Sequence, residues 1–444
     1  MARVALFLLV AAASLAAFAA AASGSEAGAG GWSKPEILVK VGTATYHPAV
    51  VTGPTGTTVA VWDNVNPANE TFALEAGIIT VTGGIKKRPL GLMTGTFPTS
   101  SLAVGGDGTF AVAWAAPGPS KKTKSKTFGA VRVWRPGKSG FGATTLLSTG
   151  IVSNEQTLGD TPQVAVDDAG TVYVVWEGVY KKHTRIVEQQ LGTSSNGFSA
   201  PRFLSPASDD AHAARIAAHG SGNAAVSWTS SSGAVWGSII RAGHISAPTK
   251  LSPVTYAASP PSVAASSGKA SAVWEQSAAT GHVIESAVTT GSSFSSHHQV
   301  LTPTKETARF QAAALAANGF GLAAWEVSTS GGGWNVQARA MSAKGSAWGG
   351  AVSLTPAGSA VFGSAPSVAA TTGRGFVAWM QRTANHELAG VKALVGSHWS
   401  PARTFPALGP PVVSAAANPT SHDRVLGALV WPSVAGLQIA VYVR

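Results

Sequence analysis

Polar residues that could perform acid–base chemistry recur in a repeated sequence phrase, within two residues after its tryptophan. They are Asp63, Glu177, Glu275, Glu326 and Gln381. If the repeats are equivalent in space, these side chains form a ring at one level of the molecule. Such a ring could bind a cation or sugar hydroxyls, or supply a general acid and a general base. Alternatively, each side chain accepts hydrogen bonds from the backbone of a neighbouring repeat, which is a structural role.

A second group of candidates is cationic and lies in segments between the repeats. His212, Arg215 and Arg309 could bind an anionic ligand, since guanidinium groups pair well with carboxylates. The alternative is a solvated rim. We expect no metal and no cofactor. The adjacent His297 and His298 would point to opposite faces of a strand, and the chain has no Walker loop, nucleophile elbow or zinc-ligand spacing.

The repeat itself consists of small apolar residues leading up to a tryptophan, as in Tyr173-Val-Val-Trp176. Successive tryptophans lie between 46 (Trp228 to Trp274) and 62 residues (Trp114 to Trp176) apart. The eight are Trp62, Trp114, Trp176, Trp228, Trp274, Trp325, Trp379 and Trp431. A short run of this composition is typical of a strand that is buried on both faces.

Each repeat contains the signals of four strands. A Gly/Asp turn such as 167–170 precedes the tryptophan strand and joins it to an earlier apolar strand. A third strand follows, and a fourth begins near a marker such as Phe198-Ser-Ala-Pro201. Four strands in a unit of this length make one propeller blade, which must stack on its neighbours. The sequence therefore predicts an all-β fold, a β-propeller of eight four-stranded blades, with seven blades as the alternative.

The two ends of the chain complement each other. The last repeat supplies one strand after Trp431, at 437–443, and has no fourth-strand marker. That marker occurs instead at the start, as Trp32-Ser-Lys-Pro35. We expect residues 31–41 to form the outer strand of the last blade, which would close the ring and remove an open seam.

Export is predicted by the first residues. Arg3 precedes an apolar run from Val4 to Ala22, so residues 1–22 are interpreted as a signal peptide, 23–30 as a flexible linker and 31–444 as a single propeller domain. An uncleaved membrane anchor is the alternative, because the run is nearly long enough to span a bilayer. We expect a secreted monomer that has no membrane contact beyond this leader. The absence of cysteine leaves packing and ring closure to hold the fold.

The chain is basic, with a formal net charge of +11. Its lysines cluster in predicted loops at 86–87, 121–126 and 181–182. A basic surface attracts anionic polysaccharide, membrane or nucleic acid, although solvated loops are the simpler interpretation. We expect no nucleic-acid partner, because aromatic residues are not interleaved with the basic ones.

The fourth-strand marker, Trp-Ser-x-Pro followed by an aliphatic residue, resembles the segment just after the Asp-box of sialidase-like, BNR-repeat propellers. Only the tail of that motif is present, for example at 195–199, and the aspartate is missing. The Phe-Arg-Ile-Pro arginine signature of sialidases is also absent. The resemblance implies descent from a carbohydrate-binding scaffold and does not imply hydrolysis.

These observations predict a secreted, non-catalytic propeller that binds carbohydrate, cell-wall polymer or a cell-surface protein partner through its loop face. The alternative is a divergent sialidase-like glycoside hydrolase or lyase that uses carboxylates near the axial funnel. Glu177, Glu275 and Glu326 discriminate between the two. Paired carboxylates about 6–9 Å apart that converge on an open funnel would favour hydrolysis.

Overall fold

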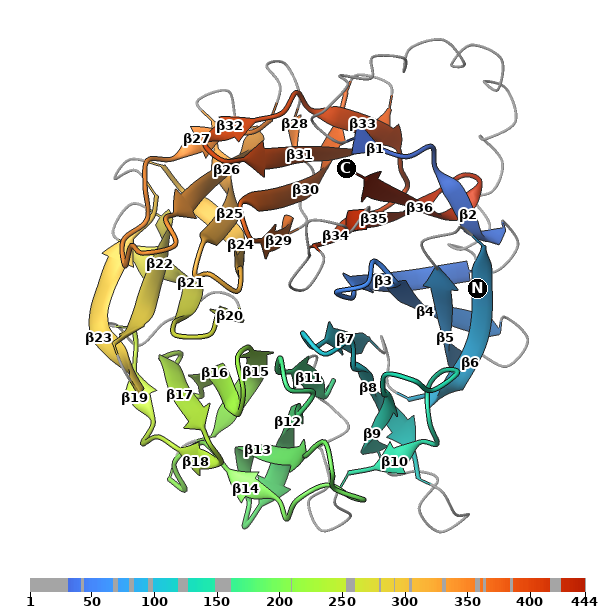
Figure 1. Ribbon diagram of the computed structural model, residues 1–444. Coiled ribbons are helices and arrows are strands. Elements are labelled where there is room, and N and C mark those ends of the chain that lie inside the picture. The colour runs from blue at the N-terminus through green and yellow to red at the C-terminus, as the bar shows by residue number, and fades with distance from the viewer. Residues whose placement is uncertain are drawn as a thin grey trace, which may run out of the picture.

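The chain forms a ring of eight β-sheets around a central axis, which confirms the predicted eight-bladed propeller (Figure 1). The computed structural model describes residues 31–40, 44–66, 71–79, 84–94, 99–118, 127–147, 161–208, 210–252, 260–278, 281–290, 292–302, 306–329, 333–355, 360–361, 365–383, 386–415 and 425–443. No helix among these residues is long and apolar enough to cross a membrane. The predicted signal peptide, the predicted linker and the lysines at 121–126 lie outside the described residues.

Each blade is an antiparallel sheet whose first strand lies innermost (Figure 1). Blade 1 holds β3 (Ala44–Thr52), β4 (Thr58–Asn66), β5 (Thr71–Ile79) and β6 (Ile85–Met93), and blade 2 holds β7 (Ser100–Val104), β8 (Phe110–Pro117), β9 (Thr127–Trp134) and β10 (Thr145–Leu146). Blade 3 holds β11 (Gln163–Val166), β12 (Val172–Tyr180), β13 (His183–Leu191) and β14 (Arg202–Phe203). Blade 4 holds β15 (Ala211–Ala218), β16 (Asn223–Ser230), β17 (Val235–Arg241) and a split outer strand, β18 (His244–Ile245) and β19 (Thr249–Lys250).

The second half of the ring repeats this order. Blade 5 holds β20 (Ser262–Ala265), β21 (Ala270–Ala278), β22 (Gly281–Thr290) and β23 (Ser293–Val300), and blade 6 holds β24 (Ala308–Leu315), β25 (Gly321–Ser328), β26 (Trp334–Met341) and β27 (Val352–Ser353). Blade 7 holds β28 (Ala360–Val361), β29 (Ser367–Thr371), β30 (Arg374–Arg382), β31 (Glu387–Val395), β32 (His398–Trp399) and β33 (Arg403–Pro406). Blade 8 combines β34 (Val412–Ala415), β35 (Val425–Ser433) and β36 (Gly436–Val443) with β1 (Gly31–Trp32) and β2 (Glu36–Lys40).

One tryptophan is buried at every junction between blades. Each of the eight repeat tryptophans lies on the second strand of its blade and packs against the preceding blade, in one of eight separate apolar clusters. Trp228, for example, packs on Tyr173 and Val175 of blade 3. Because a buried aromatic side chain supplies a large apolar area, these contacts hold the blades in sequence order around the ring.

The ring closes as predicted, with the N-terminal strands completing blade 8 beside β36 (Figure 1). Trp32 lies opposite Tyr442, and Ile37 lies opposite Gln438. The Trp32 ring also packs edge-on against Phe376 of blade 7, at 5.8 Å between ring centroids. Leu38, which is fully buried, enters the cluster around Trp62 at the junction between blades 8 and 1. The first and last repeats are therefore joined through the closing strand.

Several details differ from the sequence-based expectation. Lys86 and Lys87, which were predicted to lie in a loop, belong to the outer strand β6. The fourth strand is often only two residues long, and in blades 3 and 6 it begins after the marker, at Arg202 and at Val352. Outer strands pair on one side only, so few backbone hydrogen bonds hold them to the sheet.

Two neighbouring residues of the closing strand test this packing. We expect Leu38→Ala to lower the free energy of unfolding by about 2–5 kcal/mol, because it leaves a cavity at the junction between blades 8 and 1. Ile37→Ala is the matched control: its side chain is 44% exposed, so we expect a change within about 0.5 kcal/mol. Equal changes in the two variants, measured by denaturant titration, would contradict the closing role of this strand.

Candidate functional site

The blades present two different faces to solvent. We call the end at which first strands begin and second strands end the crossover face; it carries Asp63, Glu177, Glu275 and Glu326. The opposite end, which we call the hairpin face, carries the turns between first and second strands, such as 105–108, 167–170 and 219–222. Functional candidates on the two faces are therefore well separated along the axis of the ring.

The axial channel is mostly apolar. It has a volume of ≈ 380 Å³, and its walls are built chiefly from alanine and valine side chains of the eight innermost strands. Its polar lining residues lie toward the hairpin face, where His219 contacts Asp168 at 2.5 Å and the Ser414 and Thr52 hydroxyls are 3.0 Å apart. None of the eight candidate residues from the sequence lines this channel. The channel therefore offers little acid–base chemistry along its length.

Three of the inner strands carry a β-bulge near the crossover face. The bulges lie in β3, β15 and β24, and each contains a non-glycine residue with positive φ. These residues are His47 (φ 45), Ala213 (φ 56) and Phe310 (φ 54). This backbone conformation costs free energy for a residue with a Cβ, and it often occurs at ligand-binding sites. All three bulges lie beside the carboxylates of the crossover face.

The junction between blades 3 and 4 brings three predicted residues together. Glu177 accepts a hydrogen bond from the backbone N–H of Ala213 at 2.6 Å and lies 3.3 Å from Nδ1 of His212. Burial lowers the pKa of Arg215, and the nearby Glu177 carboxylate partly offsets this effect. Glu177 thus accepts a backbone hydrogen bond from the neighbouring blade, which is the structural role described above, and this bond connects the bulge of blade 4 to blade 3. It also orients a half-exposed imidazole.

Blade 6 contains the second assembled group. Nε of Arg309 donates to the fully buried carboxylate of Glu326 at 2.8 Å. The Arg309 guanidinium stacks on the Trp334 ring at 3.7 Å from its centroid, and it lies 4.8 Å from the centroid of Phe310. Two rings and one carboxylate therefore fix the orientation of this guanidinium.

Histidines pair with the two remaining carboxylates. Nδ1 of His47 lies 3.4 Å from Asp63, and Nδ1 of His282 lies 3.1 Å from Glu275. In each pair the carboxylate is almost fully buried while the imidazole is about two-fifths exposed. Neither histidine was singled out in the sequence, because their strand positions carry no recognisable motif.

Gln381 does not belong to this set. It stands two residues after Trp379, so it shares the face of that indole, and Met380 takes the position that the carboxylates occupy elsewhere. Its Oε1 accepts a hydrogen bond from Nε1 of Trp379 at 2.7 Å. Gln381 therefore satisfies a buried indole N–H.

Six of the nine ion pairs among the described residues lie on the crossover face. Besides the four carboxylates above, they include His183 with Asp210 at 3.5 Å and Arg382 with Glu387. No group of three or more His, Asp and Glu side chains placed to hold a metal occurs within the described ranges. The face therefore presents separate, fixed acid–base pairs.

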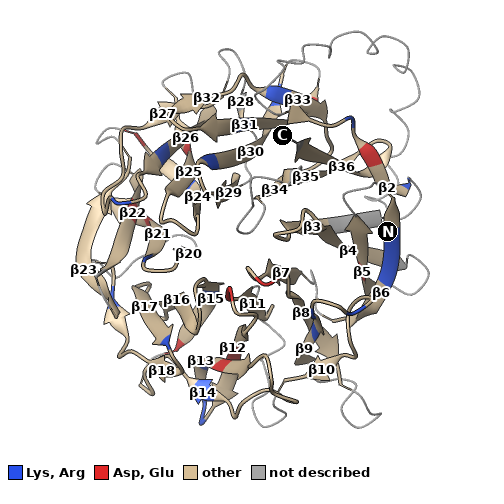
Figure 2. Cartoon of the chain, viewed as in Figure 1, with Lys and Arg blue, Asp and Glu red and all other residues tan. Residues whose placement is uncertain are grey.

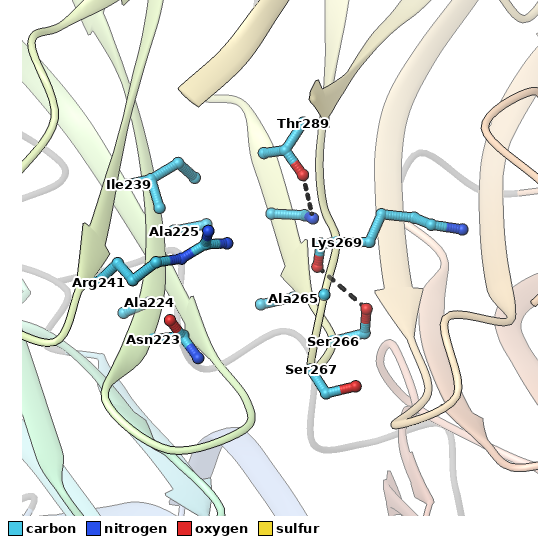
Figure 3. A pocket seen from close by; sticks show the side chains of 12 residues that line it. Asn223, Ala224, Ala225, Ile239, Arg241, Ala265, Ser266, Ser267, Lys269 and Thr289 are labelled. Atoms are coloured by element: carbon cyan, nitrogen blue, oxygen red, sulfur yellow. Dashed lines mark hydrogen bonds between the residues drawn. The ribbon is translucent and has the colours of Figure 1, made fainter. Parts of the chain in front are cut away.

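A crevice between blades 4 and 5 on the hairpin face is too small for an organic ligand. Its volume is ≈ 20 Å³, which is room for about one water molecule (Figure 3). Thr289 and Lys269 line it, but the Lys269 side chain points away from Arg241 and donates to backbone carbonyls of blade 6, including that of Ala343 at 3.2 Å. This lysine joins two blades.

Comparison with known proteins finds matches among solved structures. No family model matches the chain, and no curated protein matches it. Among solved structures, the PL25 polysaccharide lyase ulvan lyase is 12% identical, with a TM-score of 0.49 over 92% of this chain and 94% of that chain. NanB sialidase from Streptococcus pneumoniae, solved as its K499G mutant, is 12% identical, with a TM-score of 0.40 over 78% of this chain and 67% of that one.

A lectin also appears among the matches. The fucose-specific lectin from Aleuria aurantia is 13% identical, with a TM-score of 0.37 over 70% of this chain and 97% of that chain. At these identities and scores, the similarities support no argument about the activity of this chain.

The His47–Asp63 pair yields a pH test. The hydrogen bond to Asp63 raises the pKa of His47 above 6.5, with burial opposing the shift and the carboxylate charge adding to it. Because the folded-state pKa is raised, the pair stabilises the fold fully below about pH 6.5, and this contribution is lost as the pH rises through the folded-state pKa. We expect NMR titration to show the raised pKa, and Asp63→Asn to lower it.

The control is Asp168→Asn on the hairpin face, which should leave the His47 titration unchanged. Likewise, the stability advantage of the native chain over Asp63→Asn should shrink between pH 6 and pH 9. An advantage that grows over this range would contradict the assignment.

Proposed function

We propose that this protein is a secreted, non-catalytic propeller that binds a carbohydrate polymer through its crossover face. Residues 1–22 would direct its export, and the eight-bladed ring would serve as a rigid support. The carbohydrate would lie over the bulged starts of the inner strands, where the fixed acid–base pairs are concentrated. Carboxylates and imidazoles held in place offer both acceptors and donors to sugar hydroxyls.

The observation that supports this proposal best is the arrangement of Arg309. Its Nε is held by Glu326 and its plane is held against Trp334, while the side chain remains 30% exposed. The two terminal nitrogens make no hydrogen bond to the described protein, so they can receive a planar anionic group, such as the carboxylate of an acidic sugar. A guanidinium that is fixed before binding loses little conformational entropy on binding.

The geometry gives less support to glycoside hydrolysis. Hydrolysis needs one carboxyl group free to donate a proton and a second carboxylate close to it. Here Glu177, Glu275 and Glu326 lie in separate blades, and each is held by a basic side chain or a backbone amide of its own or the next blade. Groups engaged in this way are suited to holding neighbouring side chains in position.

A glycan array combined with a panel of fluorogenic glycosides tests the proposal. We expect glycan binding without turnover, and a loss of about tenfold or more in affinity on Arg309→Ala, because a charge-assisted hydrogen bond contributes about 1.5–3 kcal/mol. Arg309→Lys keeps the charge but loses the planar fork, so its affinity should lie between those of the native chain and Arg309→Ala.

Arg202→Ala is the matched control, because Arg202 also pairs with a fully buried carboxylate, that of Glu188, and is as exposed as Arg309, but lies outside the crossover face, in blade 3. It should bind like the native chain. Native-like binding by Arg309→Ala would remove this site from the proposal. Turnover that is abolished by Glu326→Gln would reject the non-catalytic assignment altogether.

A further inference from the structure

The outer edge of blade 1 differs from the other outer edges in length and charge. β6 spans nine residues, and no strand pairs with its outer side in the described structure. Lys86, Lys87 and Arg88 follow one another along it, and all three are exposed. Since side chains alternate along a strand, the cations project from both faces of the edge. Figure 2 shows a blue segment of this strand at the rim of the ring.

A fourth cation is tied to the same strand from blade 2. Arg132 of β9 donates from a terminal nitrogen to the carbonyl of Pro89 in β6 at 3.3 Å, and its Nε donates to the hydroxyl of Thr144 at 2.8 Å. We call Lys86, Lys87, Arg88 and Arg132 the basic edge. None of the four takes part in any ion pair within the described ranges. The nearby acid is Glu75, which stands opposite Pro89 on β5.

Protection of an unpaired strand edge is the simpler role for lysine and proline at this position. The other long outer strand, β23 of blade 5, allows a comparison. It spans eight residues and reads Ser-Phe-Ser-Ser-His-His-Gln-Val, without any lysine or arginine. A long edge in this fold therefore does not need three consecutive cations. Like charges placed side by side repel one another, so the concentration on β6 favours a partner of opposite charge.

We propose that the basic edge docks a linear acidic polysaccharide. A strand edge presents its charges in a row, which suits a polymer with carboxylate or sulfate groups repeated along its length. β6 contains no aromatic residue, whereas proteins that bind single-stranded nucleic acids stack bases on aromatic rings. The basic edge lies on the circumference, away from the crossover face, so this proposal stands independently of the Arg309 site.

Charge reversal separates binding from edge protection. The triple variant Lys86→Glu, Lys87→Glu, Arg88→Glu keeps a charged edge, so it should remain folded and monomeric by size-exclusion chromatography. We expect it to lose about tenfold or more in affinity for polygalacturonate at low salt. Neutral dextran should bind neither protein, and added salt should weaken the native interaction.

The control makes the same change in net charge at dispersed positions. Lys138, Lys250 and Lys344 are exposed and lie in blades 2, 4 and 6. Changing all three to Glu should leave the affinity for polygalacturonate within about threefold of that of the native chain, because these charges form no row along one strand edge. Arg309→Ala should still bind polygalacturonate, because its basic edge is intact. A loss of binding in Arg309→Ala alone would concern the crossover-face site, whereas a loss in the clustered variant alone would concern the basic edge.

Three results would overturn the proposal. They are no binding of polygalacturonate by the native chain at low salt, equal losses in the clustered and the dispersed variants, and equally strong binding of single-stranded DNA or of vesicles containing anionic lipid. The last result would assign the basic edge to a different class of partner.

Discussion

Burial of each repeat tryptophan against the preceding blade is the interaction on which the rest of the structure depends. A blade has two faces, and no blade can cover both by itself. For seven tryptophans the preceding blade comes earlier in the chain. Trp62 has no earlier blade, so its partners come from blade 8. They are Leu38 of the N-terminal closing strand together with Val430 and Ile439 from the C-terminal repeat. Ring closure is therefore a packing requirement of blade 1.

Closure also determines where the two proposed binding surfaces lie. It fixes the start of every inner strand on one face, and this arrangement places the bulges of β3, β15 and β24 beside the buried carboxylates of the second strands. It leaves β6 as a long outer edge on the circumference. The two proposed carbohydrate contacts thus lie on different sides of one rigid ring. A long polymer could engage both, and two linked contacts bind more tightly than either alone.

The architecture could be predicted from the sequence because its determinants are local and repeated. Eight tryptophans at near-constant spacing, most of them after a glycine-containing turn, specify buried strands wherever they occur. The missing outer strand of the last repeat and the unmatched Trp32 marker indicated the closure. The positions of Asp63, Glu177, Glu275 and Glu326 on one face followed from the same repetition.

Their partners could not be predicted, because the pairs depend on bulges and on contacts between blades. His212 meets Glu177 only because a bulge in blade 4 turns that segment toward blade 3. Gln381 was grouped with the carboxylates, although Met380 occupies their position. Lys86 and Lys87 were predicted to be in a loop because a polar edge strand lacks the apolar alternation of a half-buried strand.

The most direct test of ring closure uses the absence of native cysteine. Ile37 and Gln438 face each other across β2 and β36, so the double variant Ile37→Cys, Gln438→Cys should form an intramolecular disulfide under mild oxidation, detectable by peptide mapping. Ile37→Cys combined with Val300→Cys, an exposed position in blade 5, should not. No linkage between positions 37 and 438 in a folded monomer, or equal linkage in both pairs, would contradict a blade built from the two ends of the chain.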